Sequence, residues 1–229
     1  LIILGVTALI TNVAIQKTTF KYEIPYMLLI TAVLLVMGMT GNEITFIEGV
    51  ILWILFIAYL LYLYILAKKG NDSSDEQSVK LYPVWKCLLF IVLGGVCVVI
   101  GSQLVVNGAT TIARACGMSE RFIGLTIVAF GTSLPELVTS VSAARKRNAG
   151  IAIGNIVGSN IFNILFVIGT VALICPVPFE SRFVVDTVVA ILCGVLLWGG
   201  TIRHKELRKP CGVVMLLCYA AYFVYLAAM

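Results

Sequence analysis

Charged residues are scarce in this chain, and their scarcity excludes most soluble folds. Asp, Glu, Lys and Arg make up 12% of the 229 residues, whereas hydrophobic residues make up 61%. Soluble domains are about a quarter charged and about half apolar. The single histidine, and seven cysteines without a CxxC pair, give no zinc-site pattern. The net charge of +5 is spread over short segments between apolar runs, unlike the basic patch of a nucleic-acid-binding protein.

Long apolar runs are abundant instead. A helix needs about 20 mostly apolar residues to cross the hydrocarbon core of a bilayer. The chain opens on LIILGVTALI, with neither Met nor a basic signal-peptide start, so we expect residues to be missing upstream. The mean hydropathy is +1.07, and the pattern predicts an all-α polytopic membrane protein. The predicted spans cover 24–41, 47–67, 86–106, 121–144, 150–175, 183–202 and 210–228, with part of another at 1–15.

Basic residues orient these spans, because short inner loops collect Lys and Arg. Placing the segment 68–85 inside leaves only Arg114, Arg121 and Arg182 of the 16 basic residues in outer loops. The stretch KKGNDSSDEQSVK within that segment has the composition of a flexible connector. We therefore expect three parts: the remainder of a first repeat at 1–67, a cytoplasmic loop at 68–85 and a second repeat at 86–229.

The chain contains an internal repeat. LIILGVTALI at 1–10 matches LFVIGTVALI at 165–174 in five of ten positions, and the segments 49–65 and 212–228 match in six of 17. The two offsets, 164 and 163, are nearly equal. The orientation predicted from charge runs the first segment inward and its counterpart outward, so the repeats are inverted, as in many secondary transporters. By this offset the first repeat lacks a counterpart of 85–164, which predicts missing helices.

The stretch GTSLPEL places polar groups inside an apolar span. Ala129, Thr132, Ser133 and Glu136 follow the spacing i, i+3, i+4, i+7 and would share one face of a straight helix. Pro135 frees a carbonyl in the preceding turn. Carboxylates, hydroxyls and carbonyls are the ligands that Ca²⁺ and Na⁺ prefer, and an ionisable residue inside a span indicates a functional site. The alternative is a proline-kinked helix with Glu136 hydrogen-bonded to its neighbours.

The stretch GNIVGSNIFN adds a second polar stripe. Asn155, Ser159 and Asn163 recur at every fourth residue, and Gly154 and Gly158 would let another helix approach closely. Amides and glycines are also common where membrane helices simply pack, so the stripe alone leaves both interpretations open. Two polar stripes joined by a short loop can meet, which favours a shared site.

These motifs together resemble a known family. GLTIVAFGTSLPELVTSVSAA followed by IAIGNIVGSNIFNILFVIG is similar to the α-repeat of the sodium/calcium exchanger family, in the cation/Ca²⁺ antiporter superfamily. The motif match is strong over about 120–170, and the general pattern covers the whole chain. The resemblance implies ten helices in two inverted five-helix repeats. It further implies that this chain runs from the tail of helix 3 through helix 10, with the first α-repeat upstream of Leu1.

The resemblance also implies a set of ion ligands. Several family members carry an acid where this chain has Asn163, and the neutral amide removes one negative charge from the site. This departure bears on the Na⁺ stoichiometry and on any K⁺ dependence, and it leaves a closer likeness to bacterial exchangers. The implied ligands are the carbonyls of Ala129 and Thr132, the hydroxyl of Ser133, the carboxylate of Glu136, and Ser159 and Asn163.

We therefore predict a Na⁺/Ca²⁺ antiporter, not an enzyme, in the bacterial inner (plasma) membrane. Its expected partners are Ca²⁺ and Na⁺, the lipid bilayer and the first α-repeat, with no cofactor and no nucleic acid. Glu136 would pair with a glutamate of that repeat to hold one Ca²⁺ or several Na⁺. A Ca²⁺/H⁺ antiporter, in which Glu136 carries the proton, is one alternative, and a non-transporting membrane scaffold or a channel is another.

Overall fold

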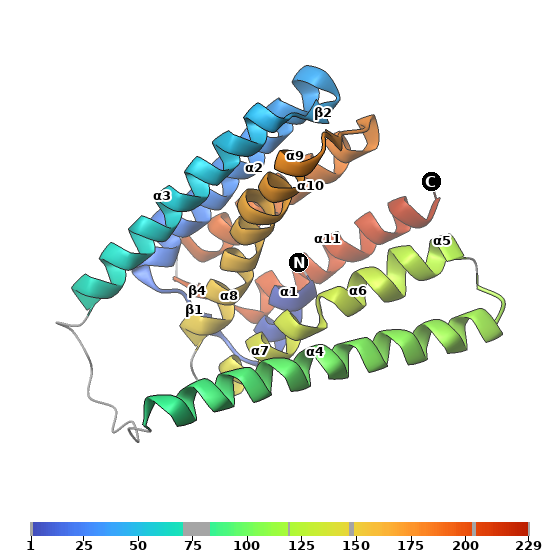
Figure 1. Cartoon of the computed structure of the whole chain (residues 1–229). Helices are drawn as coiled ribbons and strands as arrows, with labels where there is room; N and C mark the ends of the chain where they lie inside the picture. The colour runs from blue at the N-terminus through green and yellow to red at the C-terminus, as the bar shows by residue number, and fades with distance from the viewer. Residues whose placement is uncertain (1, 71–82, 119, 147–148, 203–204, 229) are drawn as a thin grey trace.

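The structure is a computed structural model that describes residues 2–70, 83–118, 120–146, 149–202 and 205–228 (Figure 1). These residues fold almost entirely into helices, as the sequence predicts for an all-α membrane protein. Six of the described helices are long and apolar enough to cross a membrane, and a bent helix pair would make a seventh span. The six are Thr19–Gly41, Phe46–Lys68, Val84–Ala115, Gly150–Ile174, Ser181–Ile202 and Lys209–Leu226.

The first part of the chain forms helices separated by two short strands. The span expected over 1–15 is shorter than predicted, because its helix ends at Ile10 and Val13 enters a strand. Thr45 and Glu48 form a capping box before the third long helix: the Glu48 carboxylate accepts bonds from the Thr45 N–H (2.7 Å) and hydroxyl (2.9 Å). The elements are α1 (Ile2–Ile10), β1 (Val13–Ala14), the π-helical turn η1 (Thr19–Glu23), α2 (Ile24–Gly41), β2 (Glu43–Ile44) and α3 (Phe46–Gly70).

The second part carries the remaining elements. The predicted cytoplasmic loop at 68–85 lies mostly outside the described residues, as do Arg147 and Arg203, which we assigned to inner loops. The elements are α4 (Val84–Ala115), α5 (Glu120–Ile123), η2 (Gly124–Val128), α6 (Ala129–Thr132), α7 (Leu134–Arg145), α8 (Ala149–Phe162), η3 (Asn163–Ile168), α9 (Gly169–Ile174), β3 (Val177–Pro178), α10 (Ser181–Ile202), β4 (Glu206–Leu207) and α11 (Lys209–Ala228).

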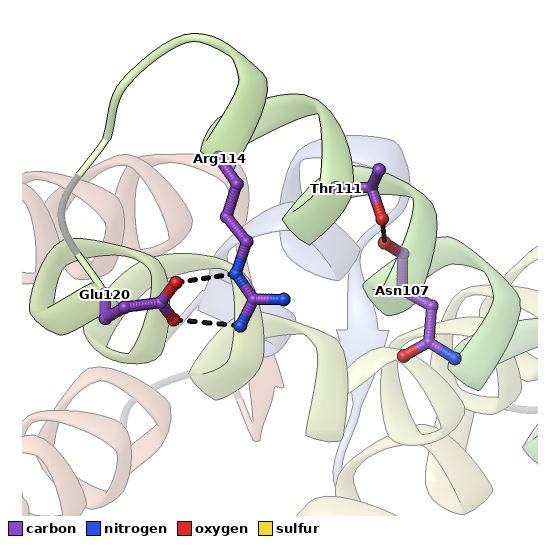
Figure 2. A network of polar contacts seen from close by, with 4 residues as sticks. All are labelled: Asn107, Thr111, Arg114 and Glu120. Carbon is purple, nitrogen blue, oxygen red and sulfur yellow. Dashed lines mark hydrogen bonds and ion pairs between the residues drawn. The ribbon is translucent and has the colours of Figure 1, made fainter.

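Helix α4 is longer than predicted and lies along the α5–α7 segment (Figure 1). Among its 32 residues, all described, Ala113 alone is buried, which is how an apolar helix faces lipid. The helix ends in a reversal at Gly117, whose φ of 77° favours glycine. Across this reversal Arg114 donates two hydrogen bonds to the Glu120 carboxylate, at 2.6 and 2.9 Å, as Figure 2 shows.

The short strands reproduce the internal repeat. Strand β1 pairs with β4, and β2 pairs with β3, both antiparallel. Val13 faces Leu207, and the residues 164 after the first and 163 before the second, Val177 and Ile44, face each other in the other pair. Each pair therefore joins one strand from each repeat, and the repeat operation converts one pair into the other.

The helices pack across the repeats in the same way. α1 packs on α11, and α9 packs on α3. A Cβ added at Gly212 would lie 3.0 Å from the Gly5 carbonyl oxygen, and one added at Gly49 would lie 3.1 Å from that of Gly169. Gly5 and Gly49 correspond to Gly169 and Gly212 by the repeat offsets, so both crossings use the same pair of small residues to bring two backbones together.

Candidate ion-binding site

The span that carries the GTSLPEL motif is bent at Ser133. Helices Thr126–Thr132 and Leu134–Arg145 meet at 50°, and Pro135 lies in the first turn of α7. The single straight helix that we used to place the ligands on one face is therefore not what forms. Pro135 cannot donate to the carbonyl four residues earlier, and that of Gly131 instead accepts a hydrogen bond from the Ser102 hydroxyl of α4, at 2.8 Å.

Helix α4 approaches this bend very closely. Gly131 is buried, and a Cβ built on it would lie 2.0 Å from Cγ2 of Val106. Only a glycine at this position lets α4 come near enough for Ser102 to reach the freed carbonyl. The bend is thus stabilised from outside the span, by one side-chain donor and one close backbone approach.

Glu136 lies in the first turn of α7, where its carboxylate faces α8. Its Oε1 accepts a hydrogen bond from the Ser159 hydroxyl at 3.1 Å. Its Oε2 is shielded from solvent and has no hydrogen-bond partner among the described residues. The positive end of the helix dipole favours a negative charge at this position, but a buried carboxylate oxygen without a partner is costly. One oxygen of Glu136 is therefore available to a cation.

Hydrogen bonds hold α7 and α8 side by side next to this carboxylate. The Asn155 amide donates to the hydroxyls of Thr139, at 2.9 Å, and Ser140, at 3.2 Å. The Thr139 hydroxyl in turn lies 2.9 Å from the carbonyl oxygen of Pro135, to which it donates. The amide and hydroxyls position the two helices so that Ser159 meets Glu136.

An open pocket of about 420 Å³ lies between α7 and α8 beside Glu136. We expected Gly154 and Gly158 to allow another helix to approach, and this expectation is wrong for the described residues. A Cβ built on either glycine would meet no described atom within 4 Å, so both glycines leave room in the pocket. The pocket is lined by Pro135, Glu136, Thr139, Gly154, Asn155, Gly158, Ser159 and Phe162.

The other predicted ligands lie outside this lining. The backbone of Ala129 begins α6, Thr132 is exposed at its end, and Ser133 occupies the bend with φ −93° and ψ 0°. Asn163 is exposed and begins η3, one turn beyond Ser159. The structure thus brings Glu136 and Ser159 together, while the other four surround them at the bend and at the end of α8.

Two contributors were absent from the predicted ligand set. Thr139 is three residues after Glu136, and this helical spacing would have predicted a shared face. Ser102 had no such signal, because it lies 29 residues before the carbonyl that it contacts. Within the described part of the chain, no three Asp, Glu, His or Cys side chains gather as a metal cluster, so Glu136 is a lone carboxylate surrounded by neutral oxygens.

Comparison with known proteins agrees with this site. The family model described as sodium/calcium exchanger protein matches residues 1–65 and 86–228. The inner membrane protein YrbG of Escherichia coli is 31% identical over 248 residues, with 99% of this chain and 72% of YrbG covered. The sodium/calcium exchanger MaX1 of Methanosarcina acetivorans is 49% identical over 92 residues, which cover 40% of this chain and 26% of MaX1.

Solved structures agree with the sequence relatives. The sodium-calcium exchanger NCX_Mj, in crystals soaked with 10 mM Na⁺ and no Ca²⁺, superposes with a TM-score of 0.79 at 33% identity. The match covers 97% of this chain and 71% of that exchanger. With six described apolar spans, this is an integral, multi-pass membrane protein of the exchanger type. The chain belongs to the sodium/calcium exchanger protein family.

Proposed function

We propose that the protein exchanges Ca²⁺ for Na⁺ by alternating access across the bacterial inner (plasma) membrane. The observation that carries the proposal is the shielded Oε2 of Glu136, which has no partner among the described residues and lies beside an open, oxygen-lined pocket. MaX1 and NCX_Mj are named sodium/calcium exchangers, and YrbG is named an inner membrane protein. These names support the choice of ions and of membrane.

In this proposal Glu136 is the central ligand, and the Ser159 hydroxyl turns an oxygen lone pair towards the bound ion. Ca²⁺ takes about six to eight oxygen ligands, more than this side of the site offers. A second carboxylate from a first α-repeat would provide the remainder. The other ligands that we propose from this chain are the carbonyls of Ala129 and Thr132, the hydroxyl of Ser133 and the amide oxygen of Asn163.

Antiport follows from the charge of such a site. Two carboxylates neutralise one Ca²⁺ or are shared among several Na⁺, so that one ion type displaces the other. An empty pair of facing carboxylates leaves charge uncompensated in a medium of low dielectric constant. The empty carrier would therefore change its orientation slowly, which couples the two fluxes.

The test is Na⁺-driven uptake of ⁴⁵Ca²⁺ into proteoliposomes that contain the full-length protein. We expect Glu136→Gln, which keeps the shape and removes the charge, to reduce uptake to the background of empty vesicles. The matched control is Glu120→Gln, the same substitution at an exposed acid, which should transport normally. Normal uptake by Glu136→Gln would end the proposal.

The same vesicles separate the alternatives. A Ca²⁺/H⁺ antiporter would take up Ca²⁺ in response to a pH gradient without Na⁺, whereas we expect uptake only with a Na⁺ gradient. A non-transporting scaffold would give no flux in the wild-type protein, and Glu136→Gln would then change only its stability.

A further inference from the structure

A second buried carboxylate lies far from α7 and α8, between η1, α2 and α3. Glu23 is only 8% exposed and lines a pocket of about 270 Å³. Four tyrosines surround it, and we call this group the tyrosine cage. The cage consists of Tyr22, Tyr26, Tyr59 and Tyr62.

The rings of the cage are held in place by their mutual contacts. Tyr26 and Tyr59 stack with ring centroids 5.5 Å apart, and Tyr62 lies 6.2 Å from Tyr59 and 6.0 Å from Tyr22. The Tyr26 hydroxyl donates to the carbonyl oxygen of Leu55 at 2.9 Å, which fixes its ring against α3. The Tyr62 hydroxyl is buried without a partner among the described residues.

The cage holds negative charge without a matching cation. Glu23 has a side-chain hydrogen bond with Thr19, four residues earlier, and no ion pair is found for it within the described ranges. Ca²⁺ and Na⁺ need several oxygen ligands, whereas this lining is mostly ring surface. Aromatic faces around a carboxylate favour an ammonium group, which is attracted to the rings as well as to the acid.

The surroundings of the cage fit a lipid headgroup. Tyrosine is enriched where spans meet the membrane surface, and Glu23 lies near the start of the span Thr19–Gly41. At the rim, Nζ of Lys21 lies 5.3 Å from the Tyr22 ring centroid. A basic group beside an anionic, aromatic pocket matches a zwitterionic headgroup, with its phosphate on Lys21 and its amine inside.

We propose that the tyrosine cage binds the ammonium group of phosphatidylethanolamine, with Glu23 as its counter-ion and Lys21 contacting the phosphate. The repeat counterpart of Glu23 is Asp186, and it does not form such a cage. Asp186 accepts a hydrogen bond from the Tyr222 hydroxyl at 2.5 Å, and Val189 stands where the first repeat has Tyr26. The cage is therefore specific to α2 and α3, and Asp186 provides a matched control.

Native mass spectrometry of the purified full-length protein tests this proposal, with phosphatidylethanolamine and phosphatidylglycerol of identical acyl chains. We expect Glu23→Gln to weaken phosphatidylethanolamine binding about tenfold and to leave phosphatidylglycerol binding unchanged. Asp186→Asn should leave both unchanged. Tyr22→Leu removes a ring that is 50% exposed, so this variant should fold normally and bind phosphatidylethanolamine severalfold more weakly.

Three results would overturn the proposal. The first is equal affinity of the wild-type protein for the two lipids. The second is unchanged phosphatidylethanolamine binding in both Glu23→Gln and Tyr22→Leu. The third is displacement of the lipid by an equal concentration of free phosphoethanolamine, which would assign the cage to a soluble amine. Because the cage shares no residue with the Glu136 pocket, loss of lipid binding with normal Ca²⁺ uptake separates this inference from the proposed function.

Discussion

The Ser102 hydroxyl donates a hydrogen bond to the Gly131 carbonyl oxygen at 2.8 Å, and so joins α4 to the bend before Glu136. This carbonyl is the one that Pro135 leaves without its helical donor. The contact gives α4 a part in shaping the candidate site, although α4 contributes no residue to its pocket.

Ser102→Ala should destabilise the bend. Loss of one partner of a buried hydrogen bond costs about 1–3 kcal/mol, which we expect to lower the Tm of the purified protein by several degrees. Ser102→Thr keeps a hydroxyl and should restore most of the loss. Ser142→Ala, at an exposed serine of α7, is the control, and an equal Tm shift in this variant would show that the contact has no special role.

Gly131→Ala should push α4 away from the bend. The added Cβ would lie 2.0 Å from Cγ2 of Val106, and overpacking of this kind costs about 1–3 kcal/mol. The double variant Gly131→Ala/Val106→Ala removes the clashing methyl group and should recover stability in the same thermal assay. Gly101→Ala, where a Cβ would meet no described atom within 4 Å, should leave Tm nearly unchanged. A double variant no more stable than Gly131→Ala would contradict the steric explanation.

Asn163→Asp should change the coupling of the proposed antiporter. A second carboxylate at the end of α8 adds a negative charge near Glu136, and this charge can be balanced by a further Na⁺. We expect the number of Na⁺ exchanged per Ca²⁺ to rise, as measured from the reversal potential of proteoliposomes with fixed ion gradients. Asn163→Ser adds no charge and should keep the wild-type ratio. The prediction fails if both variants give the same reversal potential.

The pair of Arg114 and Glu120 should make a small, pH-dependent contribution to stability. The hydrogen bond from Arg114 lowers the pKa of Glu120. A carboxylate with a lowered pKa stabilises the folded state above its unfolded pKa, which is about 4.3 for glutamate, and loses that contribution as the pH falls through the lowered value. Arg114→Gln should therefore reduce Tm slightly at pH 7 and not at a pH below the lowered pKa. An equal Tm difference at both pH values would count against the ion pair.

The periodic features of this fold could be predicted from the sequence, because they depend on local composition and on the repeat. The apolar runs gave the spans, and the offsets of 163 and 164 extend to details that no propensity would suggest. Asn42 and Lys205, which are 163 residues apart, both have positive φ, 55° and 50°. The predicted division at 68–85 falls mostly outside the described residues and stays a prediction.

The local geometry of the candidate site could be predicted only in part. Helical spacing brought Ser159 and Glu136 into the same proposed site, and they are in contact. The 50° bend and the donor on α4 could not be foreseen, because a proline indicates a disturbed helix but neither its angle nor the partner of the freed carbonyl. Those depend on which helix packs against Gly131, which is a property of the tertiary structure.

The packing of α1 on α11, of α9 on α3, and of the strands in mixed pairs has a consequence for biosynthesis. The inner faces of the first 70 residues are covered by segments that follow position 160. Chains are made from the N-terminus onward, so the earliest of these helices must wait in the bilayer without their permanent neighbours until the last helices have been inserted.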